Sequence, residues 1–160
     1  MIKKVLIIIP TYNESDSIVL LLSRINKIML ELKNLYEIEV VIVDGNSSDQ
    51  VRELAFSLGF ENLKIIHQIQ KNGIGPAYKD GFEYGLEGDY SLFVQMDADL
   101  SHQPEELAKL LAVSSTNKLV IGTRWIEGGS VINWPRHRRF VSKLGTRYAS
   151  ILLGLTNRDL

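Results

Sequence analysis

The sequence contains no cysteine, and this absence removes several classes of chemistry at once. A chain without thiols forms no disulfide, no cysteine-ligated zinc or iron–sulfur site and no thiol nucleophile. Long apolar runs are lacking too, since the clean run near the start, Val5 to Ile9, is far shorter than the roughly 20 residues that cross a bilayer. The start also lacks the features of a secretory signal, so we expect a cytoplasmic location.

Two common nucleotide-binding motifs are missing as well. No segment matches G-x-x-x-x-G-K-[ST], the P-loop motif, or G-x-G-x-x-G, the dinucleotide fingerprint. The segment Lys71-Asn-Gly-Ile-Gly75 is by itself only a weak phosphate-binding signal. These absences disfavour an ATPase and a nicotinamide-dependent enzyme, which an alternating α/β chain would otherwise suggest.

The net charge of −1 hides two regions of opposite charge. Residues 1–127 carry 12 Lys and Arg against 18 Asp and Glu, whereas residues 128–158 carry six basic residues and no acid. Because a basic segment without acids attracts anions, this segment is a candidate phosphate-binding site. The length of 160 residues is that of one domain.

Short apolar strands alternate with amphipathic helices along the chain. Strands are predicted at residues 5–9, 38–43, 63–66, 90–96 and 119–121. Helices are predicted over 15–32, up to about 58, after a loop at 72–75 to about 85–88, and from 104. Ser47 and Gln50 are candidates for a capping box at the second helix. The alternation predicts an α/β fold with a mostly parallel sheet and helices on both faces. In such folds, ligands bind beyond the carboxyl ends of the strands.

Asp97 and Asp99 follow the strand predicted at 90–96. Side chains two residues apart on an extended chain point the same way, so both carboxylates can face one ligand. Because two carboxylates repel each other, their natural partner is Mg²⁺ or Mn²⁺ shared with substrate phosphates. Asp99 could instead cap the helix that follows, and the spacing alone leaves this alternative open.

Two other strand ends bring polar and aromatic groups to the same edge of the sheet. The first predicted strand is followed by Tyr12 and Glu14, and the second by Asp44. A carboxylate there can accept hydrogen bonds from a base or a ribose, and Tyr12 offers a stacking face. Three neighbouring residues are of types more typical of turns and helix caps than of ligands, namely Asn13, Ser47 and Asp49.

Six short segments follow one another along nearly the whole chain: Ile9-Pro-Thr-Tyr-Asn-Glu14, Val43-Asp-Gly-Asn-Ser-Ser-Asp49, Lys71-Asn-Gly-Ile-Gly-Pro-Ala-Tyr78, Met96-Asp-Ala-Asp-Leu-Ser-His102, Ile121-Gly-Thr-Arg124, and Asn133-Trp-Pro with Arg138 and Ser142-Lys143. Together they resemble family 2 glycosyltransferases, and within them the dolichol- and polyprenol-phosphate mannose synthases. The resemblance implies a Rossmann-like, nucleotide-sugar-binding fold of the glycosyltransferase A type. It also implies one glycosyltransferase domain over 1–160, with donor and metal binding in 1–127 and acceptor binding in 128–160.

The resemblance further implies roles for the matching residues. Positions that bind the donor are matched by Pro10, Tyr12, Glu14, Asp44, Lys71, Gly73 and Asp97. Positions that bind the metal are matched by Asp97, Asp99 and, where some relatives add a ligand, Ser101. Catalytic positions are matched by Asp99, Arg124 and Arg138, and positions that bind the acceptor phosphate by Arg138, Ser142 and Lys143.

The implied reaction moves a hexose, expected to be mannose, with inversion from a nucleotide diphosphate sugar such as GDP-mannose to a polyprenyl or dolichyl phosphate. The implied cofactor is Mg²⁺ or Mn²⁺, and nucleic acid is not an expected partner. The acceptor phosphate is largely ionised at pH 7, because its second pKa is about 6, so it needs no general base. A nucleotidyltransferase would share the carboxylate and metal chemistry but gives no role to Asn133-Trp-Pro135 or to the basic segment.

Residues 138–155 are predicted to form a helix that is basic in its first half and apolar in its second. Such a helix can lie on the cytoplasmic face of a membrane, with or without a membrane partner protein. The alternative is an ordinary core helix.

Three features depart from the family's pattern. Gly45 stands where the family usually has a second Asp, and Leu144 replaces a usual small residue. Relatives also continue past Leu160 with a Thr/Ser-Gly-Phe-Arg-like segment, so we expect a chain shortened at its C-terminus. The alternative function is therefore a nucleotide-sugar-binding module with little activity alone, which needs a partner for acceptor binding.

Overall fold

The structure is a computed structural model that describes residues 2–115, 117–122, 144–145, 147–148 and 151–152. The chain divides into two compact units, Met1–Leu119 and Val120–Leu160. The boundary predicted between residues 127 and 128 lies outside the described residues and stays a prediction.

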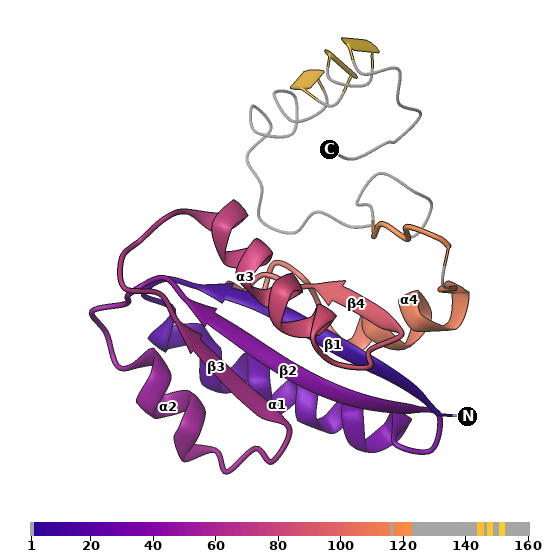
Figure 1. The fold of residues 1–160 in the computed structure, drawn as a ribbon. Helices are drawn as coiled ribbons and strands as arrows, with labels where there is room; N and C mark the ends of the chain where they lie inside the picture. The colour runs from indigo at the N-terminus through magenta and orange to yellow at the C-terminus, as the bar shows by residue number, and fades with distance from the viewer. Residues whose placement is uncertain (1, 116, 123–143, 146, 149–150, 153–160) are drawn as a thin grey trace. The chain divides into compact units, whose positions relative to one another are not determined.

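Strands and helices alternate in the first unit (Figure 1). In chain order they are β1 (Lys3–Thr11), α1 (Ser15–Leu32), β2 (Tyr36–Asp44), α2 (Val51–Ser57), β3 (Leu63–His67), α3 (Ile74–Leu86), β4 (Leu92–Gln95), the 3-10 turn η1 (Pro104–Glu106) and α4 (Leu107–Val113). The strand order is β3-β2-β1-β4, and every neighbouring pair is parallel. The predicted α/β class and its first four strands are confirmed.

β1 is an interior strand between β2 and β4, and its position decides where a ligand can bind. Ile8 pairs with Val41 of β2 on one side and with Gln95 of β4 on the other. The next two strands in the chain, β2 and β3, lie on one side of β1, and β4 lies on its other side. The direction in which strands are added to the sheet therefore reverses at β1. In parallel sheets, the loops after two strands at such a reversal diverge and leave a crevice at the carboxyl edge.

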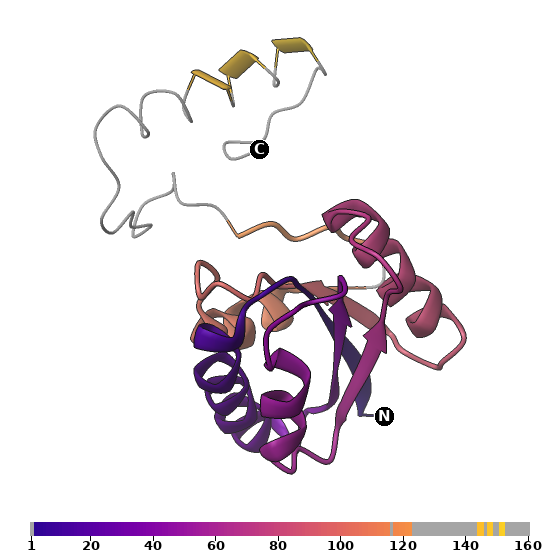
Figure 2. The same ribbon diagram turned by 90° about the vertical axis from the view of Figure 1, so that its left-hand side faces the viewer.

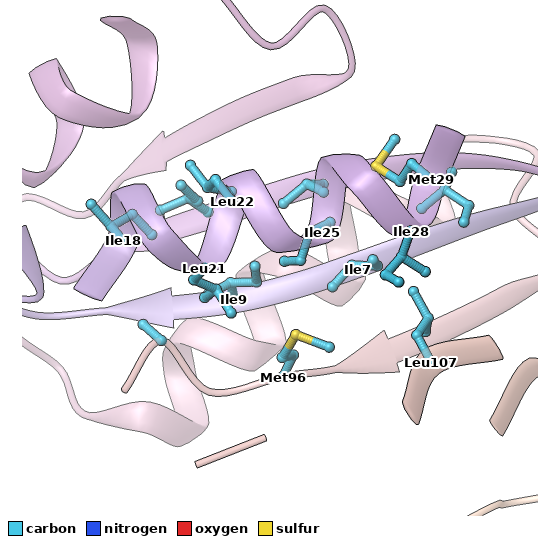
Figure 3. Close-up of a cluster of buried hydrophobic side chains, with 14 of the residues drawn as sticks. Ile7, Ile9, Ile18, Leu21, Leu22, Ile25, Ile28, Met29, Met96 and Leu107 are labelled. Atoms are coloured by element: carbon cyan, nitrogen blue, oxygen red, sulfur yellow. The ribbon is translucent and has the colours of Figure 1, made fainter. Parts of the chain in front are cut away.

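Both faces of the sheet are covered by helices, as predicted. Alternate residues of β1 point to opposite faces, so Ile7 and Ile9 pack in the cluster with α1, α2 and α4, whereas Leu6 and Ile8 pack with α3. Figure 2 shows α1 and α3 on opposite sides of the sheet, and Figure 3 shows the larger cluster. A strand buried on both faces has no polar side, which explains the unbroken apolar run of β1.

α1 has the apolar spacing predicted for it. Its buried side chains are Ile18, Leu21, Leu22, Ile25, Ile28 and Met29. α3 lies close to the sheet because it turns glycines toward it. A Cβ atom at Gly81 would collide with Ile8, and one at Gly85 would collide with Phe93 and Leu6.

Three local predictions are wrong. Residues 119–121 form no strand, and Leu119 is 87% exposed, so apolar burial does not stabilise one there. Pro10 lies inside β1 instead of ending it, beyond the part of β1 that pairs with β4. The capping box does not form, because α2 begins at Val51 with Gln50 itself as the N-cap, and the Ser47 hydroxyl instead accepts a hydrogen bond from the backbone amide of Asn13.

The second unit is described at a few positions only. Residues 144–145, 147–148 and 151–152 are helical, in agreement with the helix predicted over 138–155. Within the part of the chain that the structure describes, no helix is long and apolar enough to cross a membrane.

Candidate functional site

A cavity of about 310 Å³ opens at the carboxyl edge of the sheet, where the strand order reverses. Its walls come from the ends of β1, β2 and β3, from the start of α3 and from the loop after β4. The lining residues are Pro10, Thr11, Tyr12, Glu14, Gly45, Gln68, Lys71, Gly73, Ile74, Ala77, Asp97, Ala98 and Asp99. Six of the seven predicted donor-binding residues and both predicted metal-binding aspartates therefore lie around one cavity.

The Asp97 carboxylate is held from two sides. The Tyr78 hydroxyl of α3 donates a hydrogen bond to Oδ1 over 3.2 Å, and Nε2 of His102 lies 3.7 Å from Oδ2. The backbone amide of Asp97 donates to Nδ1 of His102 over 3.1 Å, which places the ring proton on Nε2, the nitrogen that faces the carboxylate. Burial, followed by the charge and hydrogen bond of Asp97, raises the pKa of Tyr78, so its hydroxyl keeps its proton.

Asp99 stays ionised and is free to bind a ligand. Burial opposes its ionisation, but hydrogen bonds from the hydroxyl and the backbone amide of Ser101 outweigh that effect, so the pKa of Asp99 is lowered. The amide bond measures 2.8 Å from the Ser101 nitrogen to Oδ1. The helical turn begins later, at Pro104 with Gln103 as its N-cap, so the alternative role of Asp99 as a helix cap is wrong.

The donor set at this edge fits a divalent cation that also binds substrate. Asp97 and Asp99 present carboxylates, the ligands that Mg²⁺ and Mn²⁺ prefer. Among the described residues, no three His, Cys, Asp or Glu side chains gather into a metal-binding group. Two carboxylates leave coordination positions of such a cation open for further ligands, among which Ser101 stays a prediction. Ser101 is exposed, and its backbone amide supports Asp99.

An aromatic face and a cation meet in the same cavity. The ammonium of Lys71, from the loop after β3, lies 3.5 Å from the centroid of the Tyr12 ring. Such a contact is a cation–π interaction. Tyr12 is 41% exposed, so its ring is accessible. Gly73, at the start of α3, has a φ angle of 90°, which a residue with a side chain would adopt only with strain.

Asp44 differs from the other predicted donor-binding residues, because it is fully buried and lies outside the set that lines the cavity. Its Oδ2 lies 3.1 Å from Nδ1 of His67 and 3.4 Å from Nε of Arg52. Its carboxylate also accepts a hydrogen bond of 3.3 Å from the backbone amide of Ser47. These contacts give Asp44 a role in fixing the loop after β2, while a role in donor binding stays a prediction.

Turn residues tie the loops after β1 and β2 together. Besides the bond between the Asn13 amide and Ser47, the Asn13 side chain accepts a hydrogen bond of 2.9 Å from the Ser48 amide. Asp49 accepts one of 2.8 Å from the amide of Ser15, at the start of α1. Asn13, Ser47 and Asp49 thus act as turn and cap residues, as their residue types predicted, and they hold Tyr12 and Glu14 in place.

Three residues of the site escaped the sequence analysis. Gln68 lines the cavity, and Tyr78 and His102 orient Asp97. A signal for Gln68 exists in the sequence, since it is a polar residue directly after an apolar strand. The predicted residues Arg124, Arg138, Ser142 and Lys143 lie outside the described residues.

Comparison with known proteins agrees with this geometry. Residues 6–159 match the family described as Glycosyl transferase family 2. The chain is 42% identical to the undecaprenyl-phosphate mannosyltransferase of Micrococcus luteus, over 98% of this chain and 63% of the relative. It is 38% identical to the polyprenol monophosphomannose synthase of Mycolicibacterium smegmatis, over 99% of this chain and 59% of the relative. The chain thus spans about three fifths of the length of these two relatives.

A solved structure shows the same fold. A mannosyltransferase from Pyrobaculum calidifontis in complex with GDP-Man and Mn²⁺ superposes with a TM-score of 0.54 at 24% identity. The match covers 69% of this chain and 32% of that protein. The α/β fold of the glycosyltransferase A type predicted from the motifs is therefore confirmed.

Proposed function

The chain belongs to glycosyl transferase family 2, and from that premise we propose that it transfers mannose from a nucleotide diphosphate sugar to a polyprenyl phosphate. The observation that carries the proposal is that Tyr12, Asp97 and Asp99 line one cavity at the carboxyl edge of the sheet. The names of the two relatives, each a transferase acting on a polyprenyl phosphate, support the choice of acceptor and sugar.

We assign the two ends of the cavity to two parts of the donor. The carboxylates of Asp97 and Asp99 hold a divalent cation, Mg²⁺ or Mn²⁺, which when bound neutralises the departing diphosphate. The Mn²⁺ and GDP-Man of the Pyrobaculum protein support a metal and suggest GDP-mannose as the donor. The Tyr12 ring stacks on the base. The Lys71 ammonium, 3.5 Å from the centroid of that ring, adds a positive charge that attracts the anionic donor.

The proposed reaction needs no general base. An oxygen of the ionised acceptor phosphate forms a bond to the anomeric carbon, while the bond between that carbon and the donor diphosphate breaks. The electron pair of the broken bond leaves with the nucleoside diphosphate, and the anomeric configuration inverts. Tyr78 and His102 keep Asp97 in place during this exchange.

The basic segment is the proposed acceptor side. Arg124 and Arg138 stabilise the charge on the phosphates, and Ser142 and Lys143 help to bind the acceptor. The helical residues that follow include Tyr148, Ile151 and Leu152, which are 70%, 76% and 69% exposed. Exposed apolar side chains beside basic residues favour peripheral contact with the cytoplasmic face of a membrane, where a polyprenyl phosphate resides.

The first test is a calorimetric titration of the chain with GDP, UDP, GDP-mannose and UDP-glucose, with and without Mn²⁺. The same sample is then assayed for sugar transfer to a short polyprenyl phosphate. We expect metal-dependent binding of GDP-mannose followed by transfer. Asp99→Ala serves as the matched variant and should lose Mn²⁺-dependent binding while it keeps the fold, because it removes a ligand and no core side chain.

The outcomes separate the possible functions. Binding with transfer supports the proposed synthase activity and identifies the nucleotide base of the donor. Binding without transfer supports the alternative of a donor-binding module that needs a separate acceptor half. No nucleotide binding at all contradicts the proposal, and unchanged Mn²⁺-dependent affinity in Asp99→Ala contradicts the metal assignment.

A further inference from the structure

Gln68 places a polar atom in the cavity wall with no bonding partner. The residue follows β3 directly and is 6% exposed. Among the described residues, its buried side-chain oxygen Oε1 has no hydrogen-bond partner. A buried acceptor without a donor is costly, and native proteins seldom retain one without a reason.

The orientation of this amide is fixed by its other contacts. Nε2 of Gln68 donates a hydrogen bond of 2.7 Å to Oδ2 of Asp80, in α3. Because an ionised carboxylate accepts hydrogen bonds only, the nitrogen must face Asp80 and the oxygen must face away from it. The backbone amide of Gln68 donates to the carbonyl of Asp44 over 2.9 Å, so the main chain is held as well.

The oxygen lies close to Gly45, which has no side chain. A Cβ atom at Gly45 would lie 3.8 Å from Oε1 of Gln68 and 3.7 Å from Cδ2 of Tyr12. The carbonyl oxygen of Thr11 would lie 3.4 Å from the same Cβ position, so the aromatic ring, the unpartnered acceptor and the end of β1 lie close together here. A flat ring with an N–H on its edge matches the first two of these groups, because it can stack on Tyr12 and donate to Oε1.

The position of Gln68 in the sheet indicates which part of a donor it meets. Gln68 follows β3, at the far side of the sheet from β4, and Asp97 and Asp99 follow β4. If the diphosphate lies at the two aspartates, as in the proposed function, the other end of a nucleoside diphosphate lies toward Gln68 and Gly45.

We propose that Gln68 determines base specificity by accepting a hydrogen bond from the imino N–H of the nucleotide base. This inference rests on the proposed function, because it assumes a nucleotide sugar in the cavity. The fixed acceptor selects guanine or uracil, which carry an imino N–H on that edge. It disfavours adenine, which has a bare ring nitrogen at the corresponding position.

The test compares parent and methylated nucleotides in calorimetric titrations of the 160-residue chain with Mn²⁺. The probes are GDP with N1-methyl-GDP and UDP with N3-methyl-UDP, since methylation replaces the imino hydrogen with a methyl group that cannot donate a hydrogen bond. The variant is Gln68→Met, which keeps the length of the side chain and removes the acceptor. The matched control is Gln70→Met, at an exposed position in the same loop.

We expect the wild-type chain to bind the parent nucleotide about tenfold more tightly than its methylated form. In Gln68→Met this ratio should fall to nearly one through weaker binding of the parent, while Gln70→Met should behave as the wild type. Circular dichroism checks the fold of each variant, and the wild-type comparison stands even where a variant does not fold.

Three results would overturn the inference, each in a distinguishable way. Equal binding of parent and methylated nucleotides by the wild type would exclude an imino contact while leaving donor binding intact. An undiminished ratio in folded Gln68→Met would assign the contact to another group, with Oε1 satisfied by a buried water. Failure of the wild type to bind either GDP or UDP would contradict the proposed function itself.

Discussion

The Tyr78 hydroxyl lies 3.2 Å from Oδ1 of Asp97 and joins α3 to the loop after β4. His102 faces the other oxygen of the same carboxylate. Asp97 is therefore oriented before any ligand binds, and Asp99 beside it is kept ionised. A carboxylate that is already oriented loses less conformational freedom when it binds a metal ion. Supporting contacts of this kind therefore raise the affinity for the metal and for the diphosphate bound with it.

Tyr78→Phe should therefore weaken Mn²⁺-dependent binding of GDP or GDP-mannose by about tenfold, because it frees one oxygen of Asp97. The free energy of unfolding should fall by only about 1 kcal/mol. Calorimetric titration and urea unfolding measure the two effects. Tyr84→Phe is the matched control, since its hydroxyl donates a bond of 2.6 Å to Glu39, a residue outside the cavity wall. Equal losses of affinity in both variants would refute the positioning role.

The stability of the fold should fall in alkaline solution. Burial raises the pKa of both Tyr78 and Tyr90, with further contributions from nearby carboxylates. Above the ordinary tyrosine value of 10.0, the unfolded chain loses protons that the folded chain keeps, so the unfolding free energy should decrease. Below that pH these two residues should cause no such decrease. Urea unfolding from pH 8 to 11 measures this, and a slope as steep in a Tyr78→Phe and Tyr90→Phe double variant would contradict the assignment.

Gly81→Ala should destabilise the protein by about 1–3 kcal/mol, because its Cβ would collide with Ile8 of β1. Gly75→Ala, in the same helix, is the control, since among the described residues nothing lies within 4 Å of a Cβ atom built there. That substitution should change the free energy of unfolding by less than about 1 kcal/mol, because Gly75 lies in the first turn of α3, directly before Pro76. Thermal unfolding compares the two, and a stabilising Gly81→Ala would mean that α3 does not lie against the sheet as described.

Arg138→Ala should spare donor binding and weaken use of the polyprenyl phosphate, through loss of charge-assisted hydrogen bonds to phosphate. The control is Lys109→Ala, which removes a positive charge from α4, away from the cavity wall. Titration with GDP-mannose and the transfer rate at varied acceptor concentration separate the two effects. Equal loss toward donor and acceptor would refute the proposed division between residues 1–127 and 128–160.

Much of the fold was predictable because its signals are local. The unbroken apolar run of β1 and the spacing of Ile18, Leu21 and Leu22 in α1 each specify an element without reference to the rest of the chain. Residues 119–121 form no strand, although their apolar side chains predicted one. Local propensity alone does not stabilise a strand of three residues when side chains such as Leu119 and Ile121 are exposed.

The site was predictable only in part. The sequence by itself determined that aspartates and aromatic groups follow parallel strands, and parallel strands bring their carboxyl ends to one edge. Only the tertiary structure decided that Asp44 is buried against His67 and Arg52, that Tyr78 holds Asp97, and that the Gln68 oxygen has no partner. These contacts join residues from different elements. The pairing of β2 with β3 and the positions of α2 and α3 against the sheet, rather than any periodic pattern, set which side chains meet.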